Sequence, residues 1–188
     1  VPVSWKDLFD TSNIPTQSGS RLLEGRIPGA DCEVIQRATQ AGMICLGKTH
    51  LSELAFSGLG INPMTQTSPN RYDLASAPGG SSSGAAASVS YDLAPIAIGS
   101  DTGGSVRSPA AGDGLVGLKT THGVVPLDGV VPLCSSFDTV GPLCRSVEDA
   151  GLMFEILSGQ KVNLGNSPDL GSIKLLVCEP SMLEPCDE

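Results

Sequence analysis

Short apolar runs alternate along this chain with stretches of helical periodicity. Four apolar or alternating runs are too short for helices and are bounded by turn residues, which favours β-strands. They cover residues 1–5, 43–46, 94–98 and 115–118. A further apolar run at 173–177 predicts another strand, whose partners we expect beyond the end of the chain.

Four segments carry helix signals. Within 32–41, apolar residues recur at positions 34, 35, 38 and 41, the spacing of one helix face, and Gly42 is suited to end the helix. Ser146 begins a capping box for a helix that Gly159 would stop. Shorter helices are expected at 85–93 and 106–111.

This alternation of helices and short strands predicts an α/β fold built in layers. Loops are expected at 11–20 and 57–77, and a linker-like stretch at 160–172. The chain opens on Val1 inside a strand and closes in an acidic stretch. We therefore expect residues 1–188 to form a single domain that is truncated at both ends.

Composition narrows the classes of partner. The formal net charge of −9 argues against a nucleic-acid backbone or an anionic membrane surface as the main partner. No apolar run approaches the ~20 residues that a membrane span needs, and no signal peptide is visible. Six cysteines form no C-x-x-C pair. We expect free thiols and a cytoplasmic location.

Histidine is too scarce for a metal cluster, because the chain holds only His50 and His122. We expect neither a metal nor a cofactor. The scarcity also bears on catalysis. A serine hydroxyl is a weak nucleophile until a base takes its proton, and a base other than histidine is needed here.

Two serine-rich glycine turns are the strongest chemical signal. The first covers 79–84 and the second covers 99–107. Glycines beside a serine let backbone N–H groups approach a small anion closely. Together with the shortage of histidine, the two turns suggest acyl transfer by serine and lysine.

The second turn follows an expected strand and precedes an expected short helix. The N–H groups from Thr102 to Ser105 can therefore converge, either on the oxyanion of a tetrahedral intermediate or on a bound anion such as phosphate. The turn by itself favours neither interpretation over the other.

Three other motif matches are weaker. The G-x-S-x-G at 80–84 would make Ser82 a nucleophile elbow, but Pro78 and Gly79 break the strand that an elbow requires. An S-x-x-K lies at 158–161 without its companion motifs downstream. The G-x-G-x-x-G at 112–117 lacks a clear preceding strand and a following helix. We interpret the last two as chance matches.

The two turns together resemble the amidase signature family. The likeness rests on Gly79–Ala87 and Gly99–Ala110, and it extends to most of the chain. Further matching segments are the lysine-aspartate stretch 1–7, the G-K-T-H stretch 47–56, and residues 115–121, 123–126 and 137–143. The resemblance implies a mixed central β-sheet covered by helices on both faces.

It also implies a Ser–cis-Ser–Lys triad. Ser105 maps to the nucleophile, Ser81 to a proton relay preceded by a cis peptide bond, and Lys6 to the base. Lys48 is the competing lysine, and we expect it to be structural at a strand end. A lysine serves as a base only if its surroundings lower its pKa.

Further roles follow from the same resemblance. The oxyanion donors would be the N–H groups of Thr102, Gly103, Gly104 and Ser105. Ser82, Asp101 and Arg107 would support the two turns, with Asp101 and Arg107 paired by charge. The chain departs from the family pattern at His50, Ser52 and His122, which leaves the substrate pocket open.

The resemblance makes a free-standing amidase acting on a small-molecule amide the leading expectation, and it allows a homodimer. One alternative is the glutaminase subunit of a tRNA-dependent amidotransferase. A non-catalytic anion-binding or scaffold module is the alternative of another class.

Overall fold

The computed structural model of the chain describes residues 1–163, 165, 171 and 173–174. Residues 173–174, the start of the strand expected at 173–177, have no regular secondary structure. The rest of that strand lies outside the described residues, as does much of the stretch expected to be a linker. Cys178 and Cys186 also lie outside them.

Five strands form one mixed sheet in the order β2-β1-β3-β5-β4. Their bounds are β1 Pro2–Lys6, β2 Ile44–Thr49, β3 Ile96–Asp101, β4 Val116–Gly117 and β5 Thr139–Cys144. β1 pairs in parallel with both β2 and β3. β5 pairs antiparallel with β3 and with β4. The parallel strands β1 and β3 therefore end at the same edge of the sheet.

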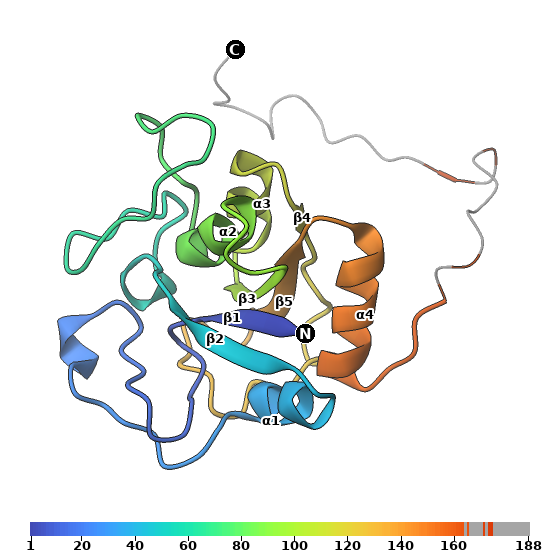
Figure 1. Cartoon of the computed structure of the whole chain (residues 1–188), viewed down its shortest axis with the longest axis horizontal. Coiled ribbons are helices and arrows are strands. Elements are labelled where there is room, and N and C mark those ends of the chain that lie inside the picture. Colours follow the sequence, from blue (N-terminus) through green and yellow to red (C-terminus); the bar gives the residue numbers. More distant parts are fainter. Residues whose placement is uncertain (164, 166–170, 172, 175–188) are drawn as a thin grey trace.

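Helices cover both faces of this sheet (Figure 1). α2, Ser83–Ser90, and α3, Arg107–Gly112, lie on one face. α1, Glu33–Gln40, and α4, Val147–Ser158, lie on the other. Short 3-10 turns occur at Arg21–Leu23 and Glu53–Ala55. This arrangement confirms the α/β fold with helices on both faces.

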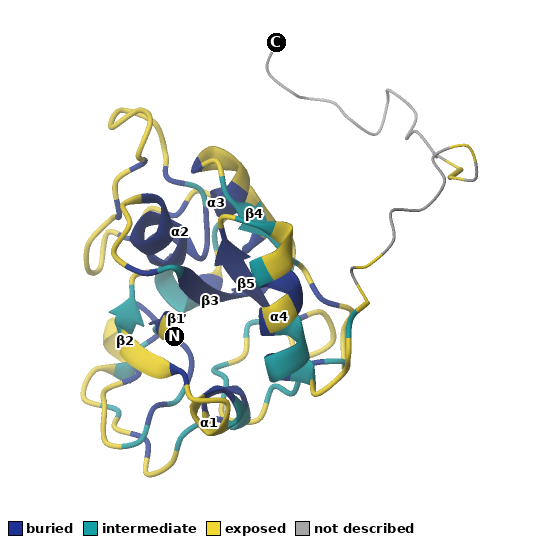
Figure 2. Ribbon diagram, turned by 45° about the vertical axis from the view of Figure 1, so that its right-hand side comes forward, coloured by how far each residue is buried: buried dark blue, intermediate teal, exposed yellow. Residues whose placement is uncertain are grey.

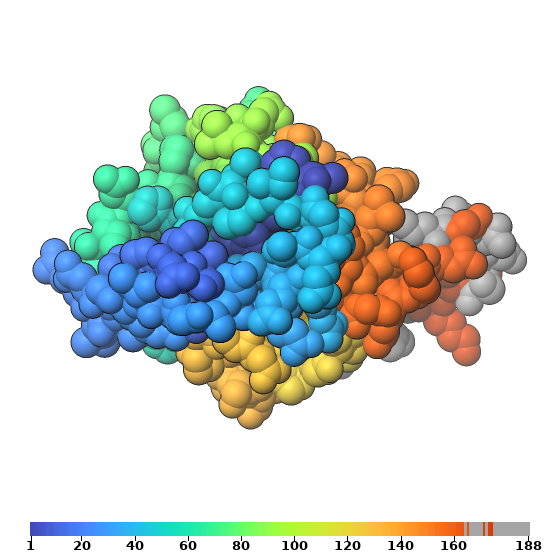
Figure 3. All heavy atoms as spheres, turned by 60° about the horizontal axis from the view of Figure 1, so that its bottom comes forward, coloured from blue at the N-terminus to red at the C-terminus, as the bar shows by residue number. Residues whose placement is uncertain are grey.

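The helix ends follow local chemistry. Ser146 Oγ accepts a hydrogen bond from the Asp149 N–H at the start of α4, and Gly159 ends the helix in the left-handed conformation at φ 74°. Both positions agree with the sequence prediction. On the same face, Arg37 of α1 donates to the Leu157 carbonyl oxygen at 2.8 Å, and Figure 3 shows α1 beside α4.

α2 is buried on every side (Figure 2). All eight of its residues are buried, and they are alanine, serine, glycine and one valine. Small side chains allow a helix to lie close to a sheet and to surrounding loops at once. A Cβ on Gly84, for example, would collide with the backbone of His50. This close packing fixes the first serine turn against the sheet.

The larger part of the core lies on the opposite face, between the sheet and helices α1 and α4. It contains Trp5, Phe9 and Ile98 together with Met153 and Leu157. The Trp5 and Phe9 rings meet edge to face with centroids 5.4 Å apart. Burial of Trp5 and Phe9 on either side of Lys6 anchors the segment that carries this lysine.

β5 is the element that the apolar pattern missed. It contains Gly141 and Pro142, two residues that are unfavourable in strands. Pro142 lies opposite Ile98 of β3, and its carbonyl oxygen accepts from the Leu118 N–H at 3.1 Å. At Gly141 the backbone of Leu118 passes so close that a Cβ would collide with its carbonyl oxygen.

This collision yields a prediction for Gly141→Ala. Because the atom in the way is backbone, it cannot move without disturbing the β4–β5 pairing, and we expect a loss of about 3 kcal/mol or more in the free energy of unfolding. Gly29→Ala is the control, since a Cβ there meets nothing within 4 Å. Urea unfolding checks both variants. Equal midpoints for the two would contradict the packing argument.

Candidate active site

A fully buried lysine lies at the centre of the site. Lys6 ends β1, and its side chain is 0% exposed. Its Nζ lies 2.6 Å from Ser81 Oγ and 2.8 Å from Ser100 Oγ. The Ser100 carbonyl oxygen is 3.5 Å away. The lysine and the first serine turn, far apart in sequence, are therefore in direct contact.

Burial changes the acid–base behaviour of this amine. Loss of water lowers the pKa of Lys6 from 10.5 to about 7, while the carboxylates of Asp101 and Asp138 act in the opposite direction. A lysine with a pKa near 7 is half neutral at neutral pH. The amine can therefore accept a proton under ordinary conditions.

Lys48, the competing lysine, has different surroundings. It lies in β2, and its Nζ donates to the Phe9 carbonyl oxygen at 2.7 Å and to Thr16 Oγ1 at 3.0 Å. A carboxylate oxygen of Asp7 is also 3.0 Å away. These contacts hold the loop after β1 in place, and they match the expected structural role.

The first serine turn is fixed to the second by hydrogen bonds. The peptide bond between Gly80 and Ser81 is cis, as the family resemblance implies. The Ser82 N–H donates to the Ser105 carbonyl oxygen at 3.1 Å. Ser82 Oγ donates to the Ser100 carbonyl oxygen at 3.2 Å. Ser82 therefore joins the two turns directly.

The second serine turn is organised around one buried carboxylate. Asp101 accepts from the N–H groups of Gly104 at 2.8 Å and Val106 at 3.1 Å. Arg107 contacts both of its oxygens at 3.0 Å through Nε and Nη2. Burial raises the pKa of Asp101, but the hydrogen bonds from Arg107, Val106 and Gly104 outweigh it and leave the pKa below its ordinary value.

These bonds affect the expected oxyanion donors unequally. The Gly104 N–H already donates to Asp101. Among the described residues, the N–H groups of Gly103 and Ser105 have no acceptor in the turns and loops, from either backbone or side chain. Thr102 donates through its Oγ1 to Asp138 at 2.5 Å. The N–H of Thr102 has no such acceptor either, because the bond to Asp138 is made by Oγ1. The N–H groups of Thr102, Gly103 and Ser105 are therefore more available to an incoming anion than that of Gly104.

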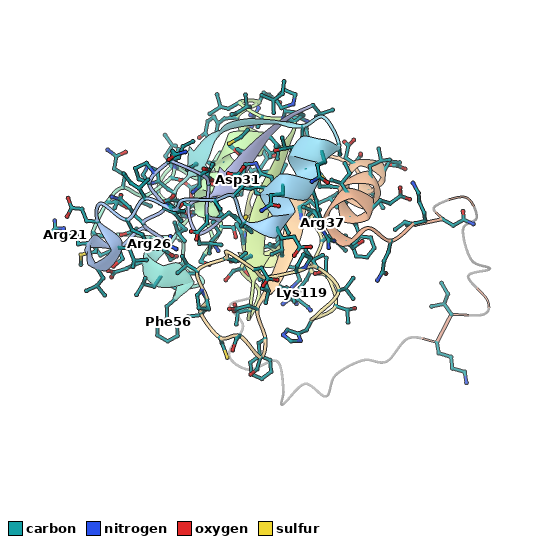
Figure 4. The ribbon with its side chains drawn as sticks, turned by 90° about the horizontal axis from the view of Figure 1, so that it is seen from below. Arg21, Arg26, Asp31, Arg37, Phe56 and Lys119 are labelled. Atoms are coloured by element: carbon teal, nitrogen blue, oxygen red, sulfur yellow. The ribbon has the colours of Figure 1, made fainter. Side chains whose placement is uncertain are left out.

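A cavity of about 330 Å³ opens beside the second turn. Its lining includes Gly80, Ser105 and Ser108, with Ala55, Phe56 and Leu133 among the apolar residues. Phe56 is 80% exposed and projects outward from the molecule (Figure 4). A larger cavity of about 800 Å³ lies at the start of α1, and none of the triad residues lines it.

Two residues of the site had no role assigned from the sequence. Ser100 contacts Lys6 through its hydroxyl, and Asp138 accepts from Thr102 and from the N–H groups of Leu133 and Cys134. Ser100 lies within the second glycine turn, next to Asp101. Asp138 lies within the stretch 137–143 that supported the family resemblance, so both were within motifs already recognised.

The weaker motifs do not form sites. Ser82 is fully buried, and the exposed His122 ring lies 2.9 Å from the Ser135 carbonyl oxygen, which does not fit a nucleophile elbow. Ser158 donates to a carbonyl oxygen within α4, and Lys161 pairs with Glu155. The stretch 112–117 runs from the end of α3 into β4, and a dinucleotide fingerprint needs a strand followed by a helix.

Three further observations concern the described part of the chain only. Its His, Cys, Asp and Glu side chains form no group of three that could hold a metal ion. None of its helices has the length and apolar character to cross a membrane. Its four cysteines, at positions 32, 45, 134 and 144, are free thiols.

Comparison with known proteins gives consistent results. A family model described as Amidase matches residues 1–176. A glutamyl-tRNA(Gln) amidotransferase subunit from Synechococcus elongatus is 45% identical over 159 residues, covering 85% of this chain and 33% of that protein.

Solved structures of two relatives also match this chain. That of the corresponding amidotransferase subunit from Thermotoga maritima has a TM-score of 0.80 and 41% identity, covering 86% of this chain and 36% of that one. The peptide amidase from Stenotrophomonas maltophilia has a TM-score of 0.80 and 40% identity, covering 86% and 34%. The chain spans about a third of the length of these relatives.

The lowered pKa of Lys6 yields a prediction about stability. Between pH 7 and 10.5 the unfolded chain binds a proton at Lys6 that the folded chain does not, so the folded state gains stability as pH rises through this range. Below pH 7 this contribution no longer changes. Relative to Lys6→Met, which cannot titrate, wild type should gain about 3 kcal/mol between pH 7 and 10.

Urea unfolding across this pH range measures the difference. Lys48→Met is the control for the loss of a lysine, since the amine of Lys48 contacts Asp7, Phe9 and Thr16. Parallel stability curves for wild type and Lys6→Met would mean that the buried amine stays charged.

Proposed function

The chain belongs to the amidase family, and we propose that the protein carrying it hydrolyses a carboxylic amide through an acyl-enzyme on Ser105. The observation that carries this proposal is the 2.6 Å contact between Lys6 Nζ and Ser81 Oγ in a fully buried setting. The amine there has a pKa near 7, so it is suited to act as a base at neutral pH.

In the proposed reaction the neutral Lys6 amine takes a proton from Ser81, and Ser81 takes one from Ser105. Ser105 Oγ then forms a bond to the carbonyl carbon of the amide. The negative charge that develops on the carbonyl oxygen is held by the N–H groups of Thr102, Gly103 and Ser105. Gly104 contributes less, because its N–H also donates to Asp101.

Collapse of this intermediate breaks the carbon–nitrogen bond. The proton returns from Lys6 through Ser81 to the leaving nitrogen, which departs as ammonia or an amine. A water molecule then attacks the ester of Ser105, and the same two residues accept and return its proton. The products are a carboxylate and the free serine.

The cavity beside Ser105 supports a free amidase as the first choice. No charged side chain lines it among the described residues, and Ala55, Phe56 and Leu133 give it an apolar side. Such a surface suits an uncharged acyl group. In this proposal the protein is cytoplasmic and needs no cofactor. A homodimer stays a prediction.

A glutaminase subunit is the second candidate. It is favoured by relatives that are named as subunits of glutamyl-tRNA(Gln) amidotransferase and are 45% identical to this chain. A non-catalytic anion-binding module is the least supported alternative, because Lys6 Nζ and Ser81 Oγ are in contact in a fully buried setting.

The nucleophile can be tested with a fluorophosphonate probe, which forms a bond from serine oxygen to phosphorus as fluoride leaves. In the intact protein we expect the label on Ser105. The labelling rate should rise about tenfold per pH unit below pH 7 and level off above it, as Lys6 becomes neutral. Peptide mapping locates the label, and Lys6→Met and Ser81→Ala should each abolish it.

Lys48→Met serves as the control, because the polar partners of the Lys48 amine are Phe9, Thr16 and Asp7 rather than a residue of either serine turn. Label on Ser82, or a rate that does not change between pH 6 and 10, would contradict the proposal.

Ammonia release separates the two candidate functions. A free amidase should release ammonia from simple apolar carboxamides in the absence of any partner, and it should act on glutamine at least about tenfold more slowly, because the described cavity offers no charge for the two ionised groups of glutamine. An enzymatic ammonia assay with the intact protein measures both rates. A preference for glutamine would support the glutaminase function instead.

A further inference from the structure

We propose that Ser100 is a positioning residue for Lys6, and that it turns the lone pair of the neutral amine toward Ser81. The inference rests on the proposed function, since it concerns the base of that reaction. Three oxygen atoms surround Lys6 Nζ, and two of them belong to Ser100.

A neutral amine has two N–H bonds and one lone pair. To take a proton from Ser81, Lys6 must present its lone pair to the Ser81 hydroxyl, and its two N–H bonds must then find other acceptors. The remaining oxygens in reach are Ser100 Oγ at 2.8 Å and the Ser100 carbonyl oxygen at 3.5 Å. Ser100 thus supplies both acceptors, of which the hydroxyl is the closer.

The position of Ser100 is itself well fixed. It lies in β3 and pairs with Val140 of β5, so its backbone cannot shift without moving two strands. Its carbonyl oxygen also accepts from Ser82 Oγ at 3.2 Å. A hydroxyl held on such a strand restricts the orientations of the amine, and this restriction is the form of preorganisation that proton transfer requires.

Ser100 is separated from the substrate side of the site. It does not line the cavity beside Ser105. It borders instead a small enclosed space of about 10 Å³. Ala55 and Leu133 line both this space and the cavity beside Ser105, so they lie between Ser100 and the substrate side. A change at Ser100 should therefore alter the chemical step without altering substrate binding. Apart from Asp138 and Ser100 itself, the space is lined by apolar residues, including Leu8, Leu127 and Val130, which suit the extra methyl group of threonine at this position.

The charges near Lys6 set the direction of the expected pH effect. The carboxylates of Asp101 and Asp138 face the amine, while Arg107 is bound to Asp101 and Lys48 is paired with Asp7. An oxygen acceptor stabilises an ammonium more than a neutral amine. Removing the Ser100 hydroxyl while these charges stay in place should therefore move the titration of Lys6 to lower pH.

The test compares Ser100→Ala with Ser100→Thr in the intact protein. In Ser100→Ala we expect fluorophosphonate labelling of Ser105 above pH 8 to slow on the order of 10- to 100-fold, and kcat for an amide to fall in parallel with KM unchanged. The midpoint of the labelling profile should move about half a pH unit or more to lower pH. Ser100→Thr, which keeps the hydroxyl, should stay within about threefold of wild type.

A purely structural role would not produce this pattern, because lost stability does not move a titration midpoint. Ser100→Cys, of similar size but with a weak acceptor, replaces Ser100→Ala if the alanine variant unfolds at the assay temperature. It should be slowed and shifted in the same direction.

Two results would overturn the inference while leaving the proposed function intact. One is labelling of folded Ser100→Ala at the wild-type rate and midpoint. The other is a folded Ser100→Thr as slow as Ser100→Ala. Absence of label on Ser105 in wild type would instead count against the proposed function itself, and the inference would fall with it.

Discussion

The burial of one amine is the constraint from which the rest of this structure follows. Lys6 is out of contact with solvent, so its nitrogen must find its polar partners within the protein. Those partners are the hydroxyls of Ser81 and Ser100. To bring these hydroxyls to the amine, the parallel strands β1 and β3 must end at the same edge of the sheet, and the first serine turn must lie across that edge. The sheet order and the packing of α2 both serve this arrangement.

Two buried carboxylates, those of Asp101 and Asp138, raise the pKa of Lys6 against the effect of burial. Desolvation favours the neutral amine, and Asp101 and Asp138 offset part of this effect. Asp101 can do so only while ionised. Arg107 and two backbone N–H groups keep it ionised. Asp101 thus both organises the second serine turn and raises the pKa of Lys6.

The sequence predicted elements and motifs better than the contacts between them. The capping of α4 by Ser146 was correct, because it depends on interactions within one turn. β5 was missed because it contains Pro142, which the local pattern counts against a strand. Pairing with the distant strand β3 makes the proline tolerable there, and the local pattern carries no information about that pairing. Spacing alone could not decide between Lys6 and Lys48; the family resemblance favoured Lys6, and the structure separates them by burial and by partners. The Ser100 contact depends on side-chain directions at the end of β3, which are fixed only when the two turns meet.

Under the proposed function, the chemical step and the choice of substrate would depend on different parts of this site. The polar atoms around Lys6, Ser81 and Asp101 are buried and bonded to one another, whereas the cavity beside Ser105 is open and has an apolar side. Relatives with different names, a peptide amidase and a glutamyl-tRNA(Gln) amidotransferase subunit, match this chain at 40% and 41% identity with the same TM-score of 0.80. Because this chain matches both relatives to the same degree, it corresponds to a region that they have in common. Under the proposed function, the buried network would carry out acyl transfer, and the choice of substrate would depend on the surfaces that border the cavity at Phe56.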